Sequence, residues 1–224
     1  MGLVDTFFNA DILVSTFPFL LLGLWNTILL ACAAIVLGSL LGVSLCLVRI
    51  YAPRVPRYVA VLYIDFFRAM PALVVLIVIY YALPYVGIRL SAFTATALAL
   101  STINAAFTAE VCRAGIESIP KGQFEAAQAL GLHFWLAMRK VVLPQALRAV
   151  IAPLVSNYVA VFKDTALASV VAMPDLLKQA SEAQALMANP TPLMGAAVIY
   201  LVILWPMIRL VGYLEVRSRR ERSA

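Results

Sequence analysis

Charged side chains are scarce in this sequence. Only 12% of its 224 residues are Asp, Glu, Lys or Arg, whereas 64% are hydrophobic, and the mean hydropathy is +0.97. A soluble domain is nearer one quarter charged and about half apolar. So few polar residues, clustered between long apolar runs, could not cover a water-exposed surface. The sequence therefore predicts an all-α integral membrane protein, for which the bilayer is the solvent.

Residues that bind metals or nucleotides are also few. His133 is the only histidine, and the three cysteines, Cys32, Cys46 and Cys112, lie in apolar stretches without metal-ligand spacing. No G-x-x-x-x-G-K-[ST] sequence occurs, so no P-loop for ATP is expected. The net charge of +6 comes from basic residues that flank apolar runs. We therefore expect no catalytic residue, no metal, no cofactor bound by this chain and no nucleic-acid partner.

Five apolar segments are long enough to cross a bilayer, within a single domain of residues 1–224. Residues 12–48 carry no charge, although one span needs only about 20 residues. We expect an interfacial segment there, followed by a tilted first span in which Gly38 and Gly42 allow close helix packing. The expected spans are residues 22–48, 58–82, 92–114, 150–171 and 193–211, with a polar loop at 117–144.

The distribution of basic residues predicts the orientation. Two basic residues, Arg89 and Lys178, fall on one side of this arrangement and twelve on the other. Because Lys and Arg are retained on the cytoplasmic side, we expect the N-terminus outside and the C-terminus in the cytoplasm. The twelve residues are Arg49, Arg54, Arg57, Arg113, Lys121, Arg139, Lys140, Arg148, Arg217, Arg219, Arg220 and Arg222.

The loop at 117–144 has the features of a short docking helix. Pro120 suits the first helical turn, and Gly131 suits a C′ position with left-handed backbone. Ala126 and Ala127 favour helix and leave little side-chain bulk, so the helix could press closely against another surface. A helix that lies on the lipid headgroups is the alternative.

This loop contains Glu125, Ala126, Ala127, Gly131, Leu143 and Pro144 at a spacing that resembles the EAA loop of ABC importer permeases. Segments 110–116, 119–123 and 163–165 are similar to the polar amino-acid uptake family of these permeases. So is the second-span motif 67–71, although Arg68-Ala69-Met70-Pro71 stands where that family often has Arg-Gly-Thr-Pro.

This resemblance implies the permease subunit of a type I importer in a bacterial inner membrane. Such a permease would move a polar or charged amino acid inward by alternating access, with ATP and Mg bound by two cytoplasmic ATPase subunits. A second permease, identical or homologous, and an external solute-binding protein would complete the complex. The alternatives are an ABC permease for another solute, an ion channel or secondary carrier that needs no ATPase, and a membrane scaffold without transport.

Polar residues within the spans form a second candidate site. Helical rise from the expected span ends places Arg68, Asn104, Lys163 and Asp164 near the bilayer midplane. Charges at this depth are costly and usually functional, and an amino acid needs both signs of charge for recognition. We expect a substrate pathway there. The alternative is a Lys163–Asp164 or Arg68–Asp65 pair that only locks helices together.

The second-span motif belongs to the same expected pathway. Met70 is included among the pathway residues. Pro71 would free a backbone carbonyl near the midplane, as broken helices do in other transporters.

Overall fold

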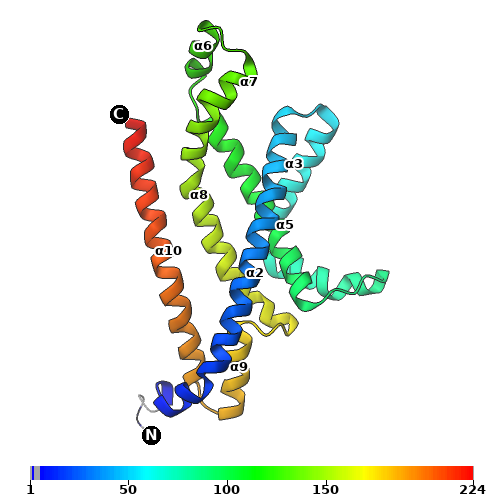
Figure 1. Ribbon diagram of the computed structural model, residues 1–224. Helices are drawn as coiled ribbons and strands as arrows, with labels where there is room; N and C mark the ends of the chain where they lie inside the picture. Colours follow the sequence, from blue (N-terminus) through cyan, green and yellow to red (C-terminus); the bar gives the residue numbers. More distant parts are fainter. Residues whose placement is uncertain (1, 3–5, 224) are drawn as a thin grey trace.

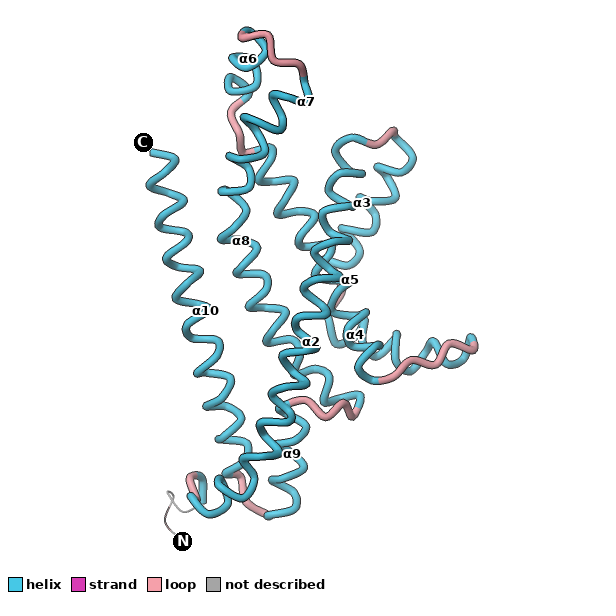
Figure 2. Tube along the Cα trace, viewed as in Figure 1, coloured by secondary structure: helices cyan, strands magenta, loops and turns pink. Residues whose placement is uncertain are grey.

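The computed structural model describes residue 2 and residues 6–223, with side chains described as far as Val216. All regular structure in this part of the chain is helical (Figures 1 and 2). The α-helices are α2 (Ala10–Tyr51), α3 (Arg54–Ala69), α4 (Ala72–Ile77), α5 (Ala92–Glu117), α6 (Lys121–Ala129), α7 (Phe134–Ala137), α8 (Leu143–Asp164), α9 (Leu176–Met187) and α10 (Thr191–Ser223). The π- or 3-10 segments are η1 (Val78–Ala82), η2 (Leu83–Val86), η3 (Met138–Val142) and η4 (Thr165–Val171).

The predicted all-α membrane fold is confirmed. Four helical segments of the described chain are long and apolar enough to cross a membrane, and a bent pair makes a fifth if it is counted as one span. The segments are Ala10–Tyr51, Ala92–Glu117, Phe134–Val171 and Thr191–Val216, with the pair Arg54–Ala69 and Ala72–Val86.

The first span differs from the expected one. It is a single helix of 42 residues that begins at Ala10, with Pro18 inside it. Residues 12–21, where a separate interfacial segment was expected, are part of this helix. Asn9 starts this helix, because its side-chain oxygen accepts a hydrogen bond from Ile12 N at 3.1 Å. At 1.5 Å per residue the helix is about 63 Å long, twice the apolar thickness of a bilayer. One part of it therefore extends beyond the hydrocarbon layer.

The second span, expected as one segment at 58–82, is two helices at 106°. Met70 has extended backbone between them, at φ −85° and ψ 132°. The cause is Pro71, which has no N–H to donate and disfavours helical backbone in the residue before it. After the break, α4, η1 and η2 run out to the side of the bundle instead of continuing along it (Figure 2).

The last two spans also start earlier than expected. Leu143 and Pro144, expected in the loop, form the first turn of α8, which continues into η4. The fifth span begins at Thr191, and its helix continues to Ser223. The predicted basic tail of Arg217, Arg219, Arg220 and Arg222 lies in this helix, with its side chains outside the described residues.

The contact between α2 and α5 confirms the close packing predicted for two glycines. A Cβ atom at Gly38 would lie 2.4 Å from Asn104 Nδ2, and one at Gly42 would lie 2.6 Å from Thr108 Cβ. No real Cβ atom sits so close to its neighbours. The two glycines therefore let the helix backbones approach, which fixes α5 as the centre of the bundle.

Different elements lie at the two ends of the bundle. Segment 117–144, the start of α3 and the end of α10 lie at one end, called here the α6 end (Figure 1). The start of α2 and α9 lie at the opposite end, the α9 end. The first loop, segment 117–144 and the end of α10 hold most of the twelve basic residues expected in the cytoplasm, and they share one end.

Candidate functional site: the loop at the α6 end and the charges within the spans

Helix α6 ends as the sequence predicts. Gly131 has a φ of +79°, the left-handed conformation that favours glycine. Its N–H donates to Gln128 O at 2.9 Å, and the N–H of Leu132 donates to Ala127 O at 3.1 Å. These two bonds form a Schellman cap, which satisfies the last carbonyls of α6 and turns the chain away from the helix axis.

The two faces of α6 have different surroundings. Ala127 is only 3% exposed and faces the rest of the protein. Glu125 and Ala126 are exposed, Glu125 beside the ends of α2 and α5, and Leu130, directly after the helix, is 83% exposed. The exposed surface of α6 therefore offers one acidic group, one small residue and one large apolar residue to a partner. The predicted motif residues are divided between this surface and the inner contact.

An aromatic cluster joins α6 to the first span. The ring of Phe134 packs edge-to-face against Phe124 of α6, with centroids 5.6 Å apart, and against Tyr51 at the end of α2, at 6.3 Å. Trp135 lies 6.2 Å from the Tyr51 ring. Edge-to-face aromatic pairs contribute about 0.5–1.5 kcal/mol each beyond the area that they bury. A displacement of α6 therefore acts on the end of α2.

A groove of about 630 Å³ separates α6 from the ends of α2 and α5. It is mainly apolar, and its lining includes Tyr51, Ile116, Phe124, Phe134 and Val142. Helix α6 is thus held along one edge by the aromatic cluster and is not embedded in the bundle.

The other two motif residues lie at the same end. Leu143 and Pro144 are exposed in the first turn of α8. Next to them, Gln145 Nε2 donates to Gln123 Oε1 of α6 at 3.4 Å. The structure thus brings the two parts of the predicted motif together, and connects α6 directly to the fourth span.

Arg68 belongs to an ion network that was not predicted. Its Nη1 lies 3.9 Å from Glu110 Oε1, and Glu110 also binds Arg49 at 2.8 Å and Arg113. Arg68 also stacks over the ring of Phe107, at 5.8 Å from the centroid. Glu110 could have been found from the sequence, because it is the one acidic residue in the run 92–114 and an acid there needs a basic partner.

The side-chain amide of Asn104 is hydrogen-bonded entirely within the protein. Its side chain is fully buried, and its Nδ2 donates to Ala34 O and Ile35 O of α2 at 3.2 and 3.3 Å. Its Oδ1 accepts from Thr108 Oγ1 at 3.2 Å and from Asn157 Nδ2 of α8 at 2.7 Å. The amide therefore ties three helices together and has no polar atom free for a solute. Its expected place in a pathway is not supported.

The predicted pathway residues do not share one level. Asn104 and Asn157 are hydrogen-bonded and so lie at the same height. Glu110 is six residues beyond Asn104 toward the α6 end, and Asp164 is seven residues beyond Asn157 toward the α9 end. At 1.5 Å per residue, the Arg68–Glu110 contact lies about 20 Å from Asp164 along the bundle. The depths estimated from the expected span ends were wrong because the helices extend beyond those ends.

Lys163 and Asp164 remain together at the end of α8. Lys163 is exposed and Asp164 is half-buried. Among the side chains that the structure describes, neither forms an ion pair within 4 Å, so neither predicted locking pair, Lys163–Asp164 nor Arg68–Asp65, is present. Met70, by contrast, is half-buried and packs against an apolar cluster that includes Val75 and Val171.

Known proteins are similar to this chain in sequence and in fold. Residues 34–220 match the family model described as "Binding-protein-dependent transport system inner membrane component". The chain is 35% identical over 217 residues to the "Probable glutamine ABC transporter permease protein GlnM" of Bacillus subtilis, covering 95% of this chain and 99% of that protein. It is 35% identical to the "Arginine transport system permease protein ArtQ" of the same organism, covering 83% and 86%.

Solved structures agree with this relationship. One described as an amino acid ABC transporter with histidines superposes with a TM-score of 0.86 at 33% identity, covering 92% of this chain and 96% of that one. The MetNI methionine ABC transporter shares the fold, with a TM-score of 0.72 at 20% identity over 88% and 96%. The broken second span, the exposed helix at the α6 end and these matches lead to one conclusion: the chain belongs to the family of binding-protein-dependent transport system inner membrane components, the permease subunits of ABC importers.

Proposed function

We propose that this permease carries a polar or charged amino acid into the bacterial cell. The observation that carries the substrate class is the Lys163–Asp164 pair, which has both signs of charge and no ion-pair partner among the described side chains. A carboxylate and an ammonium group on one solute complement such a pair. The relatives named for glutamine and arginine support the same class.

The proposed complex has two permeases. A second copy or a homologue would complete the wall of the pathway, because up to five spans enclose little space. Two ATPase subunits, which bind ATP and Mg, would receive the exposed surface of α6. A solute-binding protein would deliver the amino acid at the α9 end. ATP binding would bring the two α6 helices together, and the aromatic cluster and the Gln123–Gln145 bond would pass that movement to the first and fourth spans.

Uptake by purified components tests the substrate class. The permease, reconstituted in vesicles with its ATPase and binding protein, is expected to accumulate a radiolabelled amino acid only when ATP is inside with the ATPase. Glutamine and arginine should be tried first, with a neutral sugar as the control solute. Accumulation of the sugar instead, or uptake of an amino acid without ATP, would contradict the proposal.

The proposed orientation places the α6 end in the cytoplasm. We expect single cysteines at Phe8, just before α2, and at Leu186, in α9, to react with an impermeant maleimide added outside intact cells, because both side chains are exposed. A cysteine at Leu130 should react only after the membrane is opened, because the excess of Lys and Arg holds its end inside. The background should carry alanine in place of Cys32 and the other two native cysteines. Equal labelling of Phe8 and Leu130 positions in intact cells would refute this topology.

A further inference from the structure

Helix α10 is the least buried of the unbroken spans in the part of the chain that the structure describes. Only 11% of its apolar stretch is buried inside the protein, against 61% for that of α5. Leu201, Trp205 and Ile208 are each more than half exposed. An apolar surface of this kind marks a contact with lipid or with another protein.

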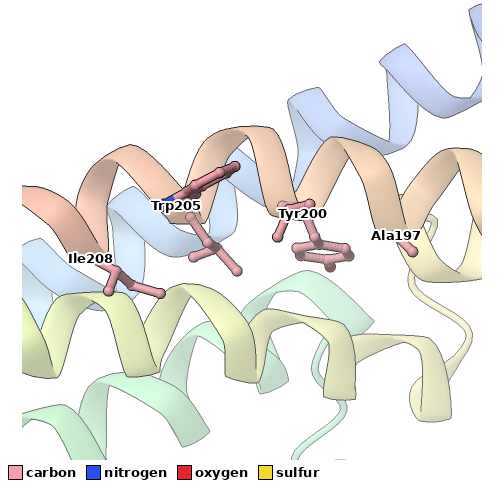
Figure 3. Close-up of a pocket in the computed structure, with 6 residues that line it drawn as sticks. Ala197, Tyr200, Trp205 and Ile208 are labelled. Carbon is pink, nitrogen blue, oxygen red and sulfur yellow. The ribbon is translucent and has the colours of Figure 1, made fainter.

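A groove in two connected parts runs along this side of α10. The apolar part has a volume of about 610 Å³ and extends from Ala197 to Ile208, and Figure 3 shows residues of its lining following one another along the helix. The second part, of about 550 Å³, shares Trp205 and Ile208 with the first and continues past Arg209 and Tyr213. From Ala197 to Ile208 the apolar part is about 16 Å long, close to the hydrocarbon thickness of one lipid leaflet.

The second part of the groove carries one positive charge. Arg209 is exposed and, among the side chains that the structure describes, forms no ion pair within 4 Å. Trp205 and Tyr213 stand four residues before and after it, so their rings flank it on the same face of the helix. Guanidinium, indole and phenol groups are all hydrogen-bond donors. Their combination, with no acidic residue in the lining, complements an anionic oxygen ligand.

The depth of Arg209 matches the level of lipid phosphates. Helix α10 begins at Thr191, and 18 further residues at 1.5 Å each place Arg209 about 27 Å along it. The hydrocarbon layer of a bilayer is about 30 Å thick. The guanidinium group therefore lies at the headgroup boundary of one leaflet, while the apolar part of the groove lies within the hydrocarbon.

A second copy of the chain complements this charge less well than a lipid does. Basic residues outnumber acidic ones in the first loop, in segment 117–144 and at the end of α10, which all lie at the α6 end. A second copy would therefore bring mainly further positive charge to this end. An anionic phospholipid brings a phosphate for Arg209 and an acyl chain for the apolar part of the groove.

We propose that α10 binds an anionic phospholipid, with its phosphate on Arg209 and Tyr213 and an acyl chain in the groove from Ala197 to Ile208. The attraction of one arginine to anionic lipid, about 1 kcal/mol, corresponds to a preference of about fivefold over a zwitterionic lipid. In the orientation proposed above, the lipid belongs to the inner leaflet. The site itself depends neither on that orientation nor on the solute carried.

Quenching of tryptophan fluorescence by brominated lipids tests this site. The full-length permease with Trp25→Phe and Trp135→Phe retains Trp205 as its one tryptophan. In mixed vesicles, we expect brominated phosphatidylglycerol to quench it at about one fifth of the mole fraction that brominated phosphatidylcholine needs. In Arg209→Gln the two lipids should quench equally. Arg54→Gln is the matched control, because it removes the same charge from an exposed position at the start of α3, and it should keep the preference.

Two results of the quenching experiment would overturn the proposal. One is equal quenching by both lipids in the permease with arginine at position 209. The other is the absence of quenching by either lipid, because a second copy would then cover this face. Tyr213→Phe keeps the ring but removes a donor, so it should weaken the preference for phosphatidylglycerol.

Thermal denaturation of the complete importer, with its native tryptophans, gives an independent measurement. Added phosphatidylglycerol should raise the Tm more than phosphatidylcholine does. The difference should disappear in Arg209→Gln and persist in Arg54→Gln. Equal responses of the two variants would show that the lipid acts on surface charge in general, which would also overturn the site.

Discussion

Replacement of Gly131 by valine is expected to lower ATP-driven uptake at least about tenfold while the protein still reaches the membrane. The φ of +79° is one that a β-branched residue resists, and a strained position of this kind costs about 1–3 kcal/mol. A Cβ atom at Gly131 would meet nothing within 4 Å, so the cost arises from the backbone and not from a clash. The two bonds of the Schellman cap would be lost, and the end of α6 would fray.

The measurements are transport and ATPase activity of the purified complex. In Gly131→Val we expect uptake to fall at least about tenfold, which corresponds to about 1.4 kcal/mol of lost docking energy. ATP hydrolysis should no longer respond to the loaded binding protein. Gly212→Val is the matched control, because Gly212 also has open space around it but lies within α10 without a positive φ. Its uptake should be unchanged.

A charge reversal on the same helix provides a separate test of the exposed surface of α6. Glu125 is exposed, so Glu125→Lys should leave the permease folded and change only what docks on it. Loss of uptake with normal membrane levels would agree with docking of an ATPase there. If both Gly131→Val and Glu125→Lys transport normally, α6 is not the helix that docks on the ATPase.

The part of this site that the sequence predicted is the part determined locally. A glycine at a helix end, preceded by alanines and a proline, fixes its own backbone through neighbours within a few residues. The conformation of Gly131 and the extent of α6 follow from that. The break at Pro71 also has a local cause, although one unbroken segment was expected at 58–82. Its angle of 106° depends on how α4 packs and could not be read from the sequence.

The surroundings of the polar residues within the spans could not be predicted in the same way. Asn104 looks available in the sequence, but its partners are carbonyls of α2 and an amide of α8, which are 50 to 70 residues away. The sequence also does not show the partner of Arg68, which is Glu110 of α5 at 3.9 Å in the folded chain. A helical count gives the depth of a residue only if the span ends are known. It does not tell which face of a helix meets another helix.

Substitution of the Lys163–Asp164 pair is expected to change recognition of the solute without loss of assembly. Asp164→Asn keeps the side-chain volume but removes the charge that would bind the ammonium group. Lys163→Met keeps the length of an exposed side chain and removes the charge for the carboxylate. A hydrogen bond to a charged group contributes about 1.5–3 kcal/mol, so each change should reduce uptake by roughly tenfold to a hundredfold. ATP hydrolysis without solute should remain.

The contrast with Asn104 separates recognition from structure. Asn104→Leu leaves Asn157 and Thr108 without a buried partner, so it should lower the yield and thermal stability of the complex. The complexes that do form should transport with an unchanged apparent affinity. Asp164→Asn should show the opposite pattern, with normal yield and a raised half-saturating solute concentration. If Asp164→Asn instead lowers the yield while transport per complex stays the same, the pair holds helices together and the solute binds elsewhere.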